Sequence, residues 1–154
     1  MAKFSFNGMD ELELSLEQLA SMPDDVKWSV LSAGAEVLKT ALQTTIKTRF
    51  MKSGEKKRGK VKPGTLLNSL QIKQKKNRNG DLIALVTPVG RHPGSKSKSR
   101  SGTNAEVAFY LEYGTPHFDA THWMEKTIQN EDTQAAIVEA EQAAYNEWLD
   151  SLGL

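Results

Sequence analysis

The sequence DDVKWSVLSAGAEVLKTALQTTIKTRF, residues 24–50, is the longest stretch with a regular hydrophobic period, and it decides the fold. Apolar side chains recur along it at helical spacing from Val26 to Ile46, and three leucines widen this stripe. Pro23 suits the first turn of a helix, and the two aspartates after it favour the positive end of the helix dipole. We therefore predict a helix of about seven turns that ends near Phe50.

A β-hairpin is predicted after this helix. Polar and apolar residues alternate from Leu67 to Lys75, with Leu70 and Ile72 on the inward side. Asn79-Gly80 is a strong signal for a tight hairpin turn, and Pro88 ends the return strand or marks an edge. These signals predict a hairpin over residues 69–76 and 81–88.

The stretch AEVAFYLEYGTPHF, residues 105–118, allows two interpretations. Val107, Phe109 and Leu111 alternate with Ala108, Tyr110 and Glu112, which favours a third strand. Ala108, Leu111 and Glu112 also fit one or two turns of a helix, which Gly114 would end at the C′ position. We predict a strand that tightens into a turn before Gly114.

Three further helices complete an α+β fold. Residues 9–20 carry an amphipathic pattern, residues 120–129 form a short helix, and Asp132 or Thr133 caps a last helix. The prediction is one domain over residues 1–154, with a small antiparallel sheet, the hairpin plus the further strand, packed against the long N-terminal helix and the C-terminal helices. Flexible basic loops are predicted near 51–64 and 90–104.

Composition limits the class of protein. Only 38% of the residues are apolar and 25% are charged, so the core is lean, which suits a chain that buries further surface against partner subunits. The chain has no cysteine, which excludes disulfides and thiolate zinc sites. We expect no signal peptide, no membrane span and synthesis in a cytoplasm.

Charge is divided unevenly along the chain. Residues 47–100 carry 16 basic and two acidic residues, whereas residues 101–154 carry one lysine and ten acidic residues. Residues 1–46 are also acidic, with three basic and seven acidic residues. Such a layout concerns partners and association rather than the fold.

Catalytic and metal sites find little support. His117, Asp119 and His122 are three possible metal ligands, but their spacing is not an established one and no fourth ligand is near. Glu112 lies near tyrosines and a histidine, yet no nucleophile motif, phosphate loop or carboxylate pair accompanies it. The alternative is that Glu112 pairs with a basic side chain or accepts hydrogen bonds from backbone donors near Gly114. We predict a protein that is no enzyme and has no cofactor or metal.

Nucleic-acid binding is the chemical alternative. Two basic groups resemble arms that neutralise phosphates, although neither loop contains an aromatic residue to stack a base. These partner-facing or DNA-facing residues are Lys56, Lys57, Arg58, Lys60, Lys62, Lys96, Lys98 and Arg100. Such an accessory protein would bind DNA or RNA through these loops without reading sequence.

The order of the elements resembles the tail-completion, or head–tail joining, proteins of long-tailed phages. The resemblance rests mainly on Phe109 to Thr115, with FSFNGMDEL at residues 4–12 and GTLLNSL at residues 64–70 in the expected order. An aromatic-Met pair, Trp123-Met124, then opens the C-terminal helices. The chain departs from the family pattern where it has Pro63-Gly64-Thr65-Leu66 instead of Thr-Gly-x-Leu.

The resemblance implies a structural virion protein without catalysis. Such proteins form a homo-oligomeric ring, usually hexameric, at the virion neck, and are made in the host cytoplasm. The ring mates the tail tube to the head connector and leaves a channel through which DNA passes. In this chain the residues expected to act as structural motif or subunit contact are Tyr110, Glu112, Gly114 and Thr115.

Overall fold

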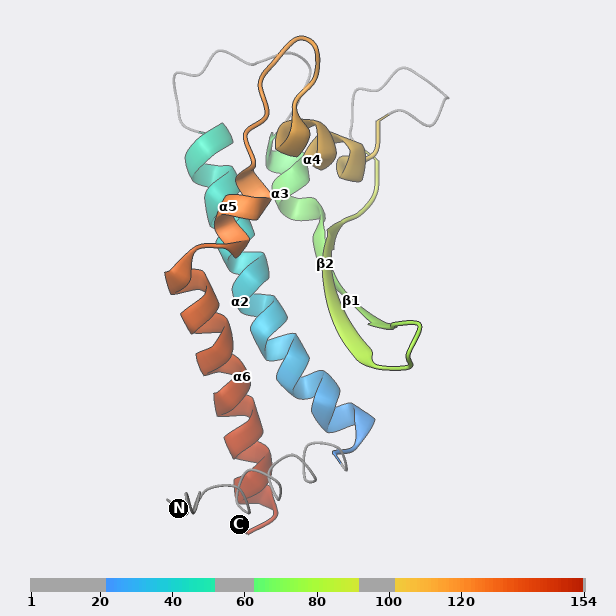
Figure 1. Cartoon of the computed structure of the whole chain (residues 1–154), viewed down its shortest axis with the longest axis vertical. Coiled ribbons are helices and arrows are strands. Elements are labelled where there is room, and N and C mark those ends of the chain that lie inside the picture. The colour runs from blue at the N-terminus through green and yellow to red at the C-terminus, as the bar shows by residue number, and fades with distance from the viewer. Residues whose placement is uncertain (1–21, 52–62, 92–101, 154) are drawn as a thin grey trace, which may run out of the picture.

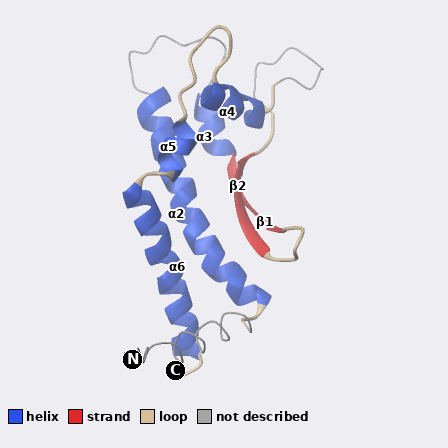
Figure 2. Ribbon diagram, viewed as in Figure 1, coloured by secondary structure: helices blue, strands red, loops and turns tan. Residues whose placement is uncertain are grey.

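The computed structural model describes residues 22–51, 63–91 and 102–153 of the chain and has an α+β fold (Figures 1 and 2). A two-stranded antiparallel sheet lies beside a long N-terminal helix and C-terminal helices. The elements are α2 (Asp24–Phe50), α3 (Pro63–Ser69), β1 (Leu70–Lys76), β2 (Leu82–Pro88), α4 (Asn104–Tyr113), α5 (Trp123–Ile128) and α6 (Glu131–Ser151). The helix predicted over residues 9–20 lies outside the described residues.

Helix α2 is the central element, and its predicted bounds are confirmed. Its first turn contains Asp24 and Asp25 and its last turn contains Lys47 and Arg49, an arrangement that complements the helix dipole at both ends. In Figure 1, α6 lies along one side of α2 and the β1–β2 hairpin lies along the other. Both packing layers of the domain therefore use α2.

The hairpin is also confirmed. Its strands pair with Ile72 opposite Val86, on the side that packs toward α2. At the turn, the side-chain oxygen of Asn77 accepts hydrogen bonds from the backbone N–H groups of Asn79 and Asp81, at 2.9 and 2.8 Å. Gly80 has φ +90°, a conformation that glycine adopts without strain.

The core lies where the C-terminal half of α2 meets α3, α4 and α5. It is built around Ile46, Leu66 and Trp123, which are fully buried. The Trp123 ring meets the edge of Phe50 at a centroid distance of 6.2 Å, a favourable aromatic geometry. This small core holds one end of the molecule together, whereas α6 contributes no buried residue to it.

The predicted third strand is wrong, because residues 104–113 form helix α4. The Thr103 hydroxyl accepts from the N–H of Glu106, and the Glu106 carboxylate accepts in turn from the N–H of Thr103. This capping box starts the helix, and Gly114 ends it. In this helix Ala108 is buried and Phe109 is 57% exposed, whereas Val107 and Leu111 pack against the core.

Two helix boundaries also differ from the predictions. Residues 63–69, expected to be loop and the start of a strand, form the short helix α3. Helix α6 is capped by Asn130, whose side chain accepts from the N–H of Thr133, rather than by Asp132 or Thr133. Of the helices described, none has the length and apolar character needed to cross a membrane.

Candidate functional site

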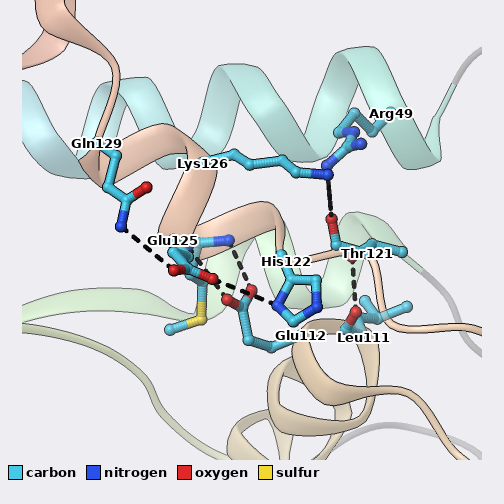
Figure 3. A network of polar contacts seen from close by, with 9 residues as sticks. Arg49, Leu111, Glu112, Thr121, His122, Glu125, Lys126 and Gln129 are labelled. Atoms are coloured by element: carbon cyan, nitrogen blue, oxygen red, sulfur yellow. Dashed lines mark hydrogen bonds and ion pairs between the residues drawn. The ribbon is translucent and has the colours of Figure 1, made fainter.

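The joint between α4 and α5 is built around the buried carboxylate of Glu112 (Figure 3). One carboxylate oxygen accepts from the N–H of Met124 at 2.7 Å, and the other accepts from the N–H of Glu125 at 3.1 Å. These N–H groups lie in the first turn of α5, where no carbonyl of the helix can accept from them. Glu112 therefore caps α5 from the neighbouring helix and places a negative charge at its positive end.

The backbone reinforces this joint. The carbonyl of Leu111 accepts from both the N–H and the hydroxyl of Thr121, at 3.0 and 2.6 Å. The carbonyl of Glu112 accepts from the N–H of His122 at 3.1 Å. The last carbonyls of α4, which the helix leaves without partners, are thus satisfied by the segment that leads into α5.

Thr121 also connects the joint to α2. Its carbonyl accepts from the Arg49 guanidinium at 3.2 Å and from the Lys126 ammonium at 3.3 Å (Figure 3). Arg49 lies in the last turn of α2, so this contact fixes the joint to the central helix. The joint is consequently one rigid polar unit linking three helices.

The chain reverses direction between the helices through a tight turn at Gly114. This residue has φ +80°, and a Cβ there would lie 2.7 Å from the backbone nitrogen of Ala120. Thr115 and Phe118 exchange two backbone hydrogen bonds directly after it, at 2.9 and 3.2 Å. Glycine is required here both by the left-handed backbone and by the close approach of the returning chain.

A possible metal site differs from the one that the sequence suggested. Ligand atoms of Glu112, His122 and Glu125 lie within 4.8 Å of one another, whereas His117 and Asp119 are exposed on the turn and are not part of this group. Both oxygens of Glu112 are already held by backbone N–H groups, and the positive end of α5 opposes a cation. The arrangement therefore favours a capping role for Glu112 over coordination.

His122 has an unusual backbone conformation at this position. Its φ of +48° is left-handed, which is uncommon for a residue other than glycine. Its Nδ1 lies 3.3 Å from a carboxylate oxygen of Glu125, at ion-pair distance but without the geometry of a hydrogen bond. Gln129 donates to the other oxygen of Glu125 at 3.2 Å, so this carboxylate has a partner on each side.

An exposed aromatic cluster covers the outer side of α4. Phe109, Tyr110 and Tyr113 are 57%, 46% and 62% exposed. The Phe109 ring lies 4.7 Å from that of Tyr113 and 6.3 Å from that of Tyr110. Aromatic rings are enriched in protein–protein interfaces, and a contiguous exposed group of them marks a contact surface.

A groove of about 550 Å³ runs beside this aromatic cluster. Its walls come from α4, α5 and the end of β2. The apolar residues that line it include Phe109, Tyr113, Met124, Ile128 and Pro88. The apolar surface is therefore larger than the aromatic cluster on α4 and continues onto α5.

The predicted site residues fall into two groups. Tyr110, Glu112, Gly114 and Thr115 lie together in or beside the joint, with Tyr110 exposed and Glu112 buried. The basic residues from Lys56 to Lys62 and from Lys96 to Arg100 lie outside the described residues. The sequence analysis placed Phe109 in a strand and missed its exposed position on a helix. The pattern Thr103-x-x-Glu106, which is typical of a helix start, would have indicated that helix.

Comparisons with protein-family models, with curated proteins and with solved structures found no match to this chain.

Proposed function

We propose that this protein is a structural subunit of a phage neck, a tail-completion or head–tail joining ring that mates the tail tube to the head connector. The observation that carries the proposal is the joint at residues 109–125, which fixes two helices and presents three aromatic rings outward. The same residues, Tyr110 to Thr115, carry the sequence resemblance to this class. A rigid, exposed aromatic surface suits a protein that works by contact.

The chemistry of Glu112 supports a mechanical role for the joint. A general acid or base must exchange a proton with a substrate, so its carboxylate has to be reachable. Glu112 is 5% exposed and each of its oxygens accepts from a backbone N–H group. Its hydrogen bonds are those of a helix cap, and its contribution is to the angle between α4 and α5.

The experiment replaces the aromatic surface and leaves the joint intact. We expect Phe109→Ser with Tyr113→Ser to give a folded protein, because both side chains are more than half exposed. Heads and tails should then fail to join, which electron microscopy of lysates measures directly. Leu152→Ser is the matched control, since Leu152 is 54% exposed but lies at the far end of α6.

Two outcomes would count against the neck role. If mass spectrometry of purified virions does not detect this protein, it is not a structural component of the virion. Normal joined virions from a deletion mutant would do the same. Micromolar binding to DNA or RNA, with a log–log salt slope of several units, would instead favour the accessory nucleic-acid-binding role.

A further inference from the structure

Among the residues that the structure describes, two faces without a covering element lie on opposite sides of α2. Helix α2 packs against α6 on one side and against the hairpin on the other, and α6 and the hairpin have at most marginal contact with each other (Figure 1). The surfaces that α6 and the hairpin turn away from α2 therefore point in opposite directions. A head-to-tail contact between identical subunits requires two such unlike faces.

The first surface, which we name the hairpin face, consists of Gln71, Lys73, Lys75, Ile83 and Leu85. Lys73 lies opposite Leu85 and Lys75 lies opposite Ile83, and all four point away from α2 because the alternate Ile72–Val86 pair points toward it. Ile83 and Leu85 are each 38% exposed. Two aliphatic side chains thus lie on the surface directly beside two ammonium groups.

The hairpin face is positively charged. Residues 70–88 contain four basic residues and one acidic residue. Lys76, which points the other way, pairs with Asp24 at 2.7 Å. Neither Lys73 nor Lys75 has an ion-pair partner among residues 22–51, 63–91 and 102–153.

The second surface, which we name the α6 face, consists of the exposed residues Asp132, Ala135, Glu139 and Asp150. Helix α6 carries six acidic residues and no lysine or arginine. Asp132, Glu139 and Asp150 fall close to one line along the helix, because their separations are near whole numbers of turns. Val138, which is 60% exposed, lies outside this face, on the flank of α6 that borders a groove with α2 and the hairpin turn.

Helix α6 is incompletely packed within one chain. None of its residues is buried, although a helix draws most of its stability from an apolar face packed against a partner. Within the part of the chain that the structure describes, none of the three carboxylates in the row has an ion-pair partner. The α6 face therefore lacks both an apolar cover and a countercharge.

We propose that the hairpin face of one copy of this chain docks on the α6 face of the next copy, head to tail. Lys73 and Lys75 then meet the carboxylate row, while Ile83 and Leu85 pack beside Ala135. The lengths are compatible, since a seven-residue strand spans about 23 Å and a 21-residue helix about 31 Å. The inference specifies the subunit contact of the proposed neck ring and rests on that proposal for its biological setting.

A second copy fits both faces better than any other partner. The two faces carry opposite charges, each exposes an apolar side chain beside its charges, and every copy carries both faces. Nucleic acid would match the hairpin face alone and would leave the acidic α6 face uncovered. A contact between two different faces can be repeated from copy to copy until a ring closes. A contact between two copies of the same face joins only two subunits.

The test uses charge reversal on one face at a time. Lys73→Glu with Lys75→Glu alters the hairpin face, and Asp132→Lys with Glu139→Lys alters the α6 face. Lys47→Glu and Asp119→Lys are the matched controls, because both residues are exposed and lie on neither face. Thermal unfolding checks that each variant is folded, and Ala135→Arg alters the α6 face a second way should the lysine pair fail to fold.

Sedimentation velocity over a concentration series supplies the readout. We expect the wild type and both controls to form oligomers. Each face variant should be monomeric at the concentrations where the wild type associates, because the dissociation constant for subunit association rises at least about tenfold. An equimolar mixture of the two face variants should form oligomers again, because the intact α6 face of one variant meets the intact hairpin face of the other and the two reversed faces also carry opposite charges. A chain with all four substitutions should associate again, since its charges are exchanged.

Three results would overturn the inference. A wild type that is monomeric at every concentration excludes the contact, as does a face variant that associates like the wild type. A mixture of the two variants that stays monomeric excludes the pairing of these faces.

The two proposals fail separately. Normal virions without this protein exclude the neck role, whereas face variants that assemble normally exclude only this subunit contact. A hairpin variant that loses DNA binding while oligomers persist would assign that face to nucleic acid and overturn the contact.

Discussion

Gly34 of α2 and Glu141 of α6 meet where the two long helices pack, and a Cβ at Gly34 would lie 2.8 Å from Cγ of Glu141. Gly34 is itself buried. Glycine in a helix interior costs about 1 kcal/mol relative to alanine, so its presence here reflects the space that Glu141 needs. The contact places the Glu141 side chain against the backbone of α2.

The Gly34–Glu141 contact predicts a change of sign in a double-mutant cycle. We expect Gly34→Ala alone to lower the free energy of unfolding by about 1–2 kcal/mol, because the Glu141 side chain must leave its position. In a Glu141→Ala background the same substitution should instead raise it by about 0.5–1 kcal/mol through helix propensity. Urea denaturation of the four proteins measures the cycle, and additive effects would show that the two residues are independent.

Glu141 also predicts a pH dependence of stability. Burial raises the pKa of the Glu141 carboxyl above its ordinary value of 4.5. The folded state then binds the proton more tightly than the unfolded state, so this group's contribution to the free energy of unfolding falls as pH rises through the window from 4.5 to the raised pKa. The contribution is largest below that window, where the carboxyl is protonated in both states.

The variant Glu141→Gln removes this titration while keeping the size of the side chain. We expect the difference in unfolding free energy, variant minus wild type, to become more positive between acidic and neutral pH. Urea midpoints measured from pH 4 to pH 8 give this difference, and the comparison cancels the other titrating groups. A difference that stays flat, or that declines as pH rises, would contradict the direction of the shift.

The turn between α4 and α5 predicts unequal costs for two glycines. Gly114→Ala should destabilise by about 3 kcal/mol or more, because the left-handed backbone is strained and the new Cβ meets backbone atoms of the returning chain. Gly80→Ala is the matched control: Gly80 has φ +90° but nothing within 4 Å of the added carbon. It should cost only about 1–2 kcal/mol. Equal losses in thermal unfolding would mean that the close approach at Gly114 contributes nothing.

The sequence predicts well those elements whose local signals all indicate the same structure. Helix α2 repeats its apolar stripe over many turns, and the hairpin combines strand alternation with Asn79-Gly80 at the turn. Both predictions depend on local pattern and on the burial of apolar residues. In these elements the tertiary packing agrees with the local preference.

Residues 104–113 show why the site itself was harder to predict. Apolar alternation and helical spacing both fit this short stretch, so hydrophobic pattern alone cannot decide between strand and helix. Its buried side is defined by Ala108 and by a carboxylate, Glu112, whereas its largest apolar residue, Phe109, faces outward. Only the contact with α5 explains why an acidic residue is buried, and that contact is not encoded locally.

The cap that Glu112 provides to α5 gives the last prediction. Glu112→Ala leaves the N–H groups of Met124 and Glu125 without their acceptor, and an unsatisfied buried donor costs about 1–3 kcal/mol. Glu112→Gln keeps one acceptor oxygen but loses the charge. We therefore expect its free energy of unfolding, measured by urea denaturation, to lie between those of the alanine variant and the wild type. The near-ultraviolet dichroism of Trp123, which begins α5, should weaken in the same order. If the alanine variant is as stable as the wild type at neutral pH, Glu112 does not hold the joint, and the search for a chemical role of this carboxylate must reopen.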